Sequence, residues 1–361
     1  MILLIDDIKK MMKPALLSIL FLYAMISLQG CQPAIYQRTD YVFGTLVEIT
    51  IYDSEDAAPA AQAVIDDLRH LESLLHAFKN SQLSTLNQHI TEGKTEIPVS
   101  SELAQFLQSA QEDSLPISNW FNPAIGKLIA LWGFHKDDYP AEIPNQQAIN
   151  ALLKANPKMN DFTIKNNIIY VHNHTLAIDL GGYAKGIALD RAAAILKKLN
   201  IHNALINIGG NVLALGQKGE RHWTVGIRDP KENRAFAVAS LYDGEAIGTS
   251  GDYQRFFVAN GQSYHHIIDP KTGYPAKMVK AVTIIVNEPS NSGRYSDMFS
   301  KPFFIAGIDD FSTVCKHIPV SMIAFIDHNN QLYLSQKMKE RMTLINNQRV
   351  THSLPNCFFK N

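Results

Sequence analysis

The sequence has little cysteine and no excess of charge of either sign. Its 361 residues include three cysteines, none in a metal-ligand spacing such as CxxC, which argues against a zinc module or a disulfide-stapled scaffold. Thirty-three basic side chains balance 34 acidic ones, so there is no overall field to hold a polyanion, and we expect no nucleic-acid partner. Internal repeats, low-complexity tracts and long linkers are also missing, which favours one continuous domain.

Long hydrophobic runs are absent except near the N-terminus. Three lysines precede an apolar run over residues 15–28, which is shorter than the roughly 20 residues that span a bilayer. This pattern favours an export signal over residues 1–30 rather than a retained transmembrane helix. Acidic residues near the start also leave Met11 or Met12 open as the true first residue.

The segment LQGC ends this signal and places Gly30 directly before Cys31. It resembles a bacterial lipobox, in which the cysteine becomes lipid-modified after cleavage. We therefore expect a mature chain 31–361 in the periplasm, attached to the inner or outer membrane through its N-terminal lipid. The alternative is that Cys31 is an ordinary small residue near the signal's end.

Two cysteines remain in the body of the chain. Cys315 and Cys357 could bridge in an oxidising compartment, but the sequence does not place their Cα atoms. Cys315 lies in the apolar stretch FSTVCKHIPVSMIAFI, and we interpret it as a buried small hydrophobe.

Hydrophobic periodicity predicts a mixed α+β fold. Helices are expected over residues 53–77, 101–110, 185–198 and near 303–315. Strands are expected over residues 45–52, 167–172, 204–209, 222–227, 281–286 and 321–327. Short turns join the strands of the second half, which favours mixed or antiparallel sheets with packed helices over a parallel doubly wound sheet.

The motif AIDLGGYAKG is typical of an anion site. A strand end delivers Asp179, two glycines open a turn, and Lys185 lies in the first turn of the following helix. Glycines permit close approach of the backbone to a ligand, and a helix N-terminus with an ammonium group favours a phosphate. The motif is neither a Walker loop nor a GxGxxG fingerprint. The plainer interpretation is a strand-to-helix turn with a solvated lysine.

A second cluster follows in IGTSGDYQRFF and HHIIDPKTGYPA. Thr249, Ser250 and Gly251 offer hydroxyls and backbone N–H groups in what we expect to be a tight loop. His265 and His266 alternate faces on a strand, so at most one of them should point into a shared site. Taken alone, either histidine is more often structural.

A third segment is RYSDMFSKPFFIAG. Asp297 is expected to head an apolar helix, where a carboxylate is favoured by the helix dipole. The plainer interpretation is an N-cap.

Taken in chain order, these segments resemble the successive blocks of the FAD:protein FMN transferases, the ApbE family once called thiamine biosynthesis lipoproteins. The resemblance runs from about Tyr41 to about Ile323. The blocks are HAFKNSQLSTLN, FNPAIGKLIALWGF, AIDLGGYAKGIALD, LINIGGNVLALG, TVGIRDP, IGTSGDYQRFF, HHIIDPKTGYPA and YSDMFSKPFFIAG. The resemblance implies a single two-lobed domain that binds FAD, needs Mg²⁺, and moves FMN onto a Ser or Thr hydroxyl of a partner protein with release of AMP. The expected acceptor is a flavoprotein subunit of an electron-transfer complex.

The resemblance also implies a role for individual residues. His266 matches the family's proposed catalytic base, and the Gly182 carbonyl and the Asp297 carboxylate match metal ligands. The hydroxyl of Thr249 suggests a contact with FAD. The resemblance implies further FAD contacts at Phe43, Phe78, Trp120, Phe121, Asn122, Asp179, Lys185 and Ile268.

One position departs from the family pattern. Four residues after the metal-binding Asp the family has a Thr that provides a further metal oxygen, and here Lys301 stands there. A charged ammonium has three donors and no acceptor, so it cannot ligate Mg²⁺. Ser300 or water could replace the ligand, Lys301 could contact the diphosphate, or the chain could be a periplasmic FAD-binding protein with weak FAD pyrophosphatase activity or no turnover.

Overall fold

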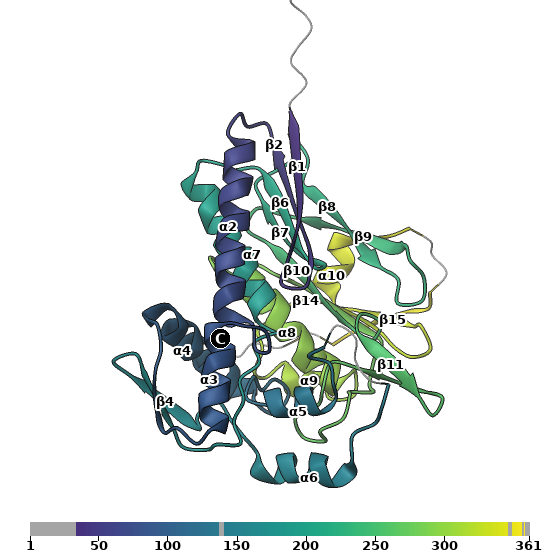
Figure 1. Ribbon diagram of the computed structural model, residues 1–361. Helices are drawn as coiled ribbons and strands as arrows, with labels where there is room; N and C mark the ends of the chain where they lie inside the picture. Colours follow the sequence, from purple (N-terminus) through teal and green to yellow (C-terminus); the bar gives the residue numbers. More distant parts are fainter. Residues whose placement is uncertain (1–33, 137–140, 346–348, 356, 358–361) are drawn as a thin grey trace, which may run out of the picture.

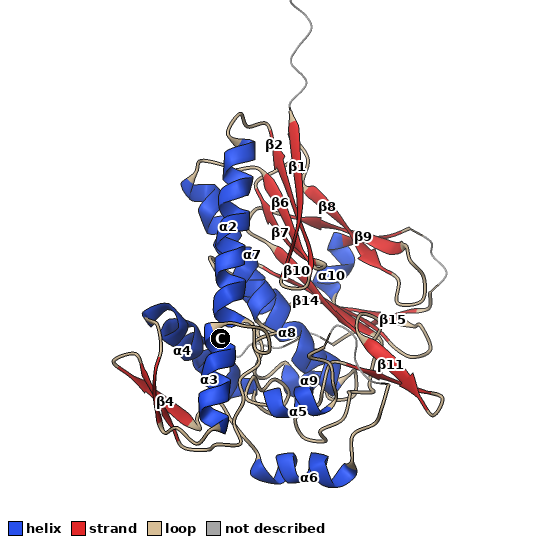
Figure 2. Ribbon diagram, viewed as in Figure 1, coloured by secondary structure: helices blue, strands red, loops and turns tan. Residues whose placement is uncertain are grey.

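A long sheet forms the centre of the molecule (Figures 1 and 2). The computed structural model describes residues 34–136, 141–345, 349–355 and 357. The expected signal and Cys31 lie outside these residues. The nine-stranded sheet has the order β1-β2-β6-β7-β10-β13-β14-β15-β17. Its strands are β1 (Ile35–Val42), β2 (Thr45–Tyr52), β6 (Ala204–Ile208), β7 (Asn211–Leu215), β10 (Ala246–Gly251), β13 (Ala281–Val286), β14 (Met322–Ile326), β15 (Leu332–Leu334) and β17 (Thr351–Ser353).

Three helices cover one face of this sheet. α2 (Ala57–Leu75) packs on α7 (Ala184–Lys198), and α7 packs on α8 (Ser292–Ala306), which lies against β10 and β13. Figure 1 shows the three helices together beside the central strands. α2 buries an apolar stripe at helical spacing, including Val64, Leu68 and Leu71, and the largest hydrophobic core lies between these helices and the sheet.

The other face is covered by a small antiparallel sheet. It has the order β16-β9-β8 and consists of β8 (Trp223–Arg228), β9 (Ala235–Leu241) and β16 (Met342–Leu344). β8 alternates buried and exposed residues, as expected of a strand with one face on a core. Helix α10 (Gln336–Arg341) lies against β9, β14 and β16. A second hydrophobic core, which includes Met338 of α10, lies between the small sheet and the central sheet.

The remaining elements surround the lower ends of α2 and α8 (Figure 1). α5, α6 and the β11–β12 hairpin enclose a third apolar cluster around Trp132 and Tyr264. These elements are α3 (Gln82–Thr91), β3 (Glu96–Pro98), α4 (Ser101–Ser114), the 3-10 turn η1 (Leu115–Ile117), α5 (Gly126–Leu131), α6 (Gln146–Ala155), β4 (Phe162–Lys165), β5 (Ile168–Val171), β11 (Phe256–Ala259), β12 (Gln262–His265) and α9 (Phe311–Val314).

The predicted α+β class with mixed or antiparallel sheets and packed helices is confirmed. Among the described strands of the central sheet, β15 and β17 pair in parallel and the others pair antiparallel. Two local predictions were wrong. Thr249, Ser250 and Gly251 belong to strand β10 rather than to a loop. Asp297 is the sixth residue of α8, which begins at Ser292, so it neither heads nor caps that helix.

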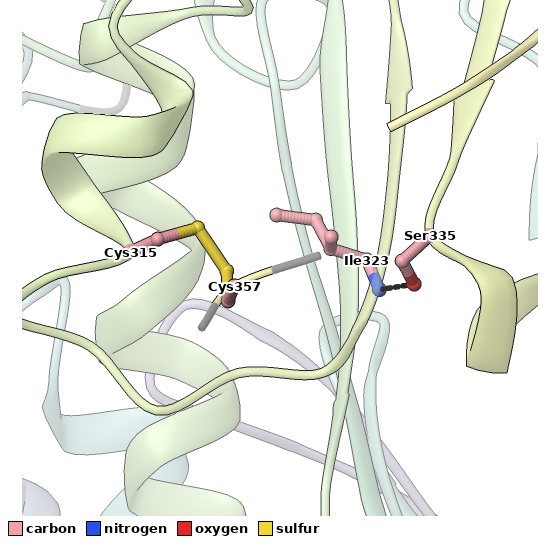
Figure 3. Close-up of a disulfide and its surroundings, with 4 residues drawn as sticks. All are labelled: Cys315, Ile323, Ser335 and Cys357. Atoms are coloured by element: carbon pink, nitrogen blue, oxygen red, sulfur yellow. Dashed lines mark hydrogen bonds between the residues drawn. A yellow bond between two sulfur atoms is a disulfide. The ribbon is translucent and has the colours of Figure 1, made fainter. Parts of the chain in front are cut away.

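The two cysteines of the body form a disulfide. Cys315, just after α9, is bonded to Cys357, and their Cα atoms are 5.1 Å apart (Figure 3). Cys315 is buried in the main core as expected, but it is a bridged half-cystine rather than a free hydrophobe. The bridge joins the C-terminal tail to the end of α9, close to β14, where the Ile323 N–H donates to the Ser335 hydroxyl.

Candidate functional site

The candidate site forms where α8 is held between α7 and β10. Gly186 of α7 faces Gly293 of α8, and a Cβ at Gly186 would lie 2.5 Å from the carbonyl oxygen of Gly293. On the other side, a Cβ at Gly248 of β10 would collide with the carbonyl oxygen of Ser296. Because α7 and β10 carry glycines at these two contacts, the backbone of α8 approaches both of them closely. Asp297, which follows Ser296 on α8, therefore reaches the start of α7.

Asp297 is the buried centre of this crossing. Its side chain is 2 % exposed, and Oδ2 accepts a hydrogen bond from the Gly186 N–H at 3.1 Å. Oδ1 lies 2.7 Å from the ammonium of Lys301 and 3.8 Å from that of Lys185. Burial opposes ionisation, but the charges of Lys185 and Lys301 outweigh it and lower the pKa of Asp297 to about 2. The group is therefore a buried carboxylate with two cations beside it.

Lys301 lies one helical turn after Asp297 on the same face of α8. Its Nζ donates to the Asp297 carboxylate and, at 2.6 Å, to the Asp297 main-chain carbonyl. The aliphatic stem lies against Gly182, where a Cβ would be 2.8 Å from Lys301 Cε. The structure thus brings Gly182 and Asp297 together, as the sequence predicted, with the lysine side chain between them.

The glycine turn before α7 carries the other predicted phosphate-binding groups. Asp179 Oδ1 accepts from the Gly181 N–H at 2.7 Å, which closes the turn, and Lys185 Nζ lies 3.5 Å from the Gly181 carbonyl. Burial raises the pKa of Asp179, although the Gly181 N–H and the charges of Arg255 and Lys185 oppose this. The N–H groups of Gly181, Tyr183 and Ala184 donate within the turn. The turn therefore presents the positive end of the α7 dipole together with the Lys185 ammonium.

His266 directly follows strand β12. Its Nδ1 lies 3.3 Å from the main-chain carbonyl of Arg255. Because a carbonyl can only accept a hydrogen bond, Nδ1 carries the proton in this contact, and Nε2 of the neutral ring carries the lone pair. Burial, together with the positive charges of Lys185 and Arg255, lowers the pKa of His266 to about 3. The ring is neutral at pH 7 and near the same cations as Asp179.

His265 points elsewhere and has a structural environment. It is buried, its Nε2 lies 2.6 Å from the Ala276 carbonyl, and its ring meets the edge of Phe304. Burial lowers the pKa of His265 to about 4.

Aromatic residues predicted to contact FAD flank the turn. The N–H groups of Gly126 and Asp179 donate to the carbonyls of Ala177 and Pro123, respectively, and this pairing sets the segment after Trp120 beside the glycine turn. Phe121 lies against Gly182. The amide of Asn122 is engaged with the Pro157 carbonyl and the Ala124 N–H, so its side chain holds the loop.

Three more aromatic residues predicted to contact FAD have partners of their own. The ring of Trp120 faces the Lys271 ammonium at 5.4 Å and His317 at 5.6 Å. Phe78 contacts the His135 ring and lines a pocket of about 340 Å³ whose wall includes Ala177. Phe43 occupies the β1–β2 turn, where its N–H donates to Glu72.

The last two predicted FAD contacts have protein partners. Thr249 Oγ1 hydrogen-bonds Thr283 Oγ1 at 3.0 Å across β10 and β13, and Ile268 is buried in the third apolar cluster. The neighbouring Ser250 was grouped with Thr249 from the sequence, but its contact with Ser300 at 2.8 Å was not foreseen. Arg255 was also missed, and its only signal was a position inside the quoted block GDYQRFF.

Comparison with known proteins decides the family. The ApbE family model matches residues 43–325. The chain belongs to the ApbE family. A FAD:protein FMN transferase of Rhodobacter capsulatus is 35% identical over 310 residues, which cover 85% of this chain and 58% of that protein. One from Klebsiella pneumoniae is 28% identical and is covered over 94% of its length. The chain thus spans little more than half of the first relative and nearly all of the second.

Solved ApbE structures have the same fold. The ApbE protein of Thermotoga maritima superposes with a TM-score of 0.76 at 29% identity, covering 85% of this chain and 99% of that one. The flavin transferase ApbE of Vibrio cholerae gives a TM-score of 0.73 at 24% identity, covering 86% and 100%.

The residues present do not fit the Mg²⁺ ion that resemblance to this family implies. Among the described residues, no group of three or more His, Cys, Asp or Glu side chains is arranged to hold a metal. Oδ1 of the buried Asp297 carboxylate faces two ammonium groups, which would repel a divalent cation. That Gly182 and Asp297 bind Mg²⁺ stays a prediction.

Proposed function

We propose that this chain transfers the FMN portion of FAD to a Ser or Thr hydroxyl of a partner flavoprotein and releases AMP. The observation that carries this proposal is the meeting of the glycine turn, Lys185, Lys301 and Asp297 near His266, in a chain of the ApbE family. In the reaction the acceptor oxygen forms a bond to the FMN phosphorus. The bond between the FMN phosphorus and the bridging oxygen of the diphosphate breaks, and AMP leaves with that oxygen and the electron pair.

The cations would bind the diphosphate. Phosphoryl transfer depends mainly on positioning and on stabilising charge on the phosphate oxygens. Lys185 and Lys301 provide two ammonium groups beside the glycine turn at the N-terminal end of α7. Mg²⁺ is implied for the family, but the donor set here does not fit it, so we assign no step to a metal ion.

His266 would accept the proton of the acceptor hydroxyl. Its Nε2 carries a lone pair, and its ring is neutral at pH 7. A pKa of about 3 describes a weak base, but it is partly caused by the charges of Lys185 and Arg255. Burial is the largest cause of the low pKa, and a negative diphosphate would offset only the part due to Lys185 and Arg255, so binding of FAD should raise the pKa of His266 from that value.

The aromatic residues would hold the rings of FAD. Phe78 is half-buried and lines the pocket beside Ala177, whereas Trp120 is buried with its ring facing the Lys271 ammonium. An aromatic face suits either the flavin or the adenine ring. Phe121 lies against the glycine turn, so a ring placed on this side would lie next to a diphosphate bound there.

We further propose that the mature chain acts in the periplasm, lipid-anchored at Cys31, on a flavoprotein subunit of an electron-transfer complex. The disulfide Cys315–Cys357 supports an oxidising compartment. Among the described residues, no helix is both long enough and apolar enough to span a bilayer.

Incubation with FAD and a flavoprotein domain bearing an acceptor Thr tests the proposed reaction. In-gel fluorescence measures the labelled acceptor, and chromatography measures AMP and free FMN. Labelled acceptor with an equal amount of AMP supports the transferase, whereas an acceptor whose Thr is replaced by Ala should remain unlabelled. AMP and free FMN without label would indicate a pyrophosphatase, and bound FAD with neither product would indicate a binding protein.

A further inference from the structure

We propose that the ammonium of Lys301 replaces a divalent cation at Asp297, so that the chain binds the diphosphate of FAD with a cation of its own. The inference rests on the proposed function because FAD is taken as the ligand. It makes a distinct claim, namely that a metal ion is not required at this position.

The geometry places the ammonium where a cation bound to Asp297 would lie. Nζ of Lys301 is 2.7 Å from the carboxylate and 2.6 Å from the main-chain carbonyl of the same residue. An ammonium has three N–H donors, so these two contacts leave one donor for a ligand at the glycine turn. The side chain is 15 % exposed, which indicates that it is largely packed in place.

The packing of the stem fixes this position. The Lys301 methylenes fill the space beside Gly182, because a Cβ there would lie 2.8 and 3.1 Å from Cε and Cδ. A metal ion coordinated by the Gly182 carbonyl and Asp297 would have to displace the lysine from both residues. That displacement would take a buried carboxylate away from its ion-pair partner.

The charges at the site favour an anion over a second cation. The Asp297 carboxylate lies beside two ammonium groups, Lys301 at 2.7 Å and Lys185 at 3.8 Å, so these three groups together carry a net positive charge. A divalent cation would add to this charge, whereas a diphosphate would compensate it.

The neighbouring hydroxyl is engaged and does not supply a metal ligand. Ser300 Oγ donates to the Asp297 carbonyl at 2.8 Å and contacts Ser250 Oγ at 2.8 Å. The side chain is buried against β10. Of the alternatives that the sequence left open, the structure favours direct contact of Lys301 with the diphosphate over replacement of the metal ligand by Ser300.

Equilibrium binding of FAD, followed by quenching of flavin fluorescence, tests the inference on the full chain. For the unchanged protein we expect the dissociation constants in EDTA and in Mg²⁺ to agree within about twofold. For Lys301→Thr we expect roughly tenfold weaker binding in EDTA and recovery with Mg²⁺. Lys198→Thr, an exposed lysine in the last turn of α7, is the control and should behave like the unchanged protein.

Binding of Mn²⁺, followed by electron paramagnetic resonance without FAD, gives a readout that does not depend on flavin binding. We expect the unchanged protein to leave Mn²⁺ free, and Lys301→Thr to bind it. Addition of Asp297→Asn to that variant should abolish the binding. Thermal melting verifies that each variant is folded.

Each outcome decides one of the two claims. If the unchanged protein binds FAD in Mg²⁺ but not in EDTA, or takes up Mn²⁺ at Asp297, the inference is wrong and the transferase proposal stands. If FAD binds under neither condition, the proposed function is wrong, and the Mn²⁺ measurements still decide the role of Lys301. If Lys301→Thr does not fold, the FAD dissociation constants of the unchanged protein in EDTA and in Mg²⁺ still decide whether a metal ion is required.

Discussion

Replacement of Asp297 by Asn should destabilise the protein in a pH-dependent manner. The carboxylate pKa falls from 3.8 to about 2 on folding, which corresponds to about 2 kcal/mol of stability at pH 7. Because the folded-state pKa is the lower one, this stability is present above pH 3.8 and is lost as the pH falls toward 2. Asn keeps the shape of the side chain but leaves the Lys301 ammonium without its countercharge, which adds to the loss.

Urea unfolding at pH 7 and pH 3 measures this effect. We expect Asp297→Asn to be less stable than the unchanged protein by at least about 2 kcal/mol at pH 7, and the difference to shrink by about 1 kcal/mol at pH 3. Asp309→Asn, which changes an exposed carboxylate, is the control and should lie within about 0.5 kcal/mol at both values. If the difference in the free energy of unfolding between Asp297→Asn and the unchanged protein were the same at pH 7 and pH 3, the stability could not be assigned to the ion pair.

Three further changes examine the base, the packing of α8 and the disulfide. His266→Ala should slow acceptor labelling by a factor of about 10² to 10⁴ while the FAD dissociation constant stays within about twofold, and labelling at the normal rate would remove His266 from the role of base. Gly248→Ala should lower the free energy of unfolding by about 1 to 3 kcal/mol, because its Cβ collides with the Ser296 carbonyl; stability equal to that of the unchanged protein in urea would contradict the close packing of α8. Reduction of the Cys315–Cys357 bridge, which closes a loop with a sequence separation of 42, should lower stability by about 4 kcal/mol. An unfolding midpoint that is insensitive to dithiothreitol would show that the bridge is absent in solution.

Strands with a continuous or alternating apolar pattern could be predicted well from the sequence. β2 and β13 have the predicted bounds, because each carries a run of β-branched residues that suits a buried sheet. β10 was missed because Gly-Thr-Ser-Gly has the composition of a turn. Gly248 is needed there for another reason, the close approach of the α8 backbone, and such a tertiary contact leaves no periodic signal.

The start of α8 was missed for a related reason. Ser292 and Gly293 are weak helix formers, so the apolar pattern after Asp297 gave the only helix signal. In the structure the small side chains are required because α8 crosses α7 at Gly293 and Gly186. The sequence could therefore indicate that Asp297 belongs to a site, but not that its carboxylate lies in the second turn, where it meets the N-terminal end of α7.

The position of Lys301 follows from the helix that carries it. Asp297 and Lys301 are four residues apart on α8, so they lie on the same face one turn apart, and the lysine stem is long enough to return its ammonium to the carboxylate. A Thr at this position would end near the helix and leave the carboxylate open toward Gly182. With α8 packed against the glycines of α7 and β10 as it is here, the Thr hydroxyl and the Asp297 carboxylate would then present oxygen atoms where Lys301 now presents an ammonium. If the chain binds FAD as proposed, the residue at position 301 would decide whether the diphosphate contacts a bound metal ion or the ammonium of Lys301.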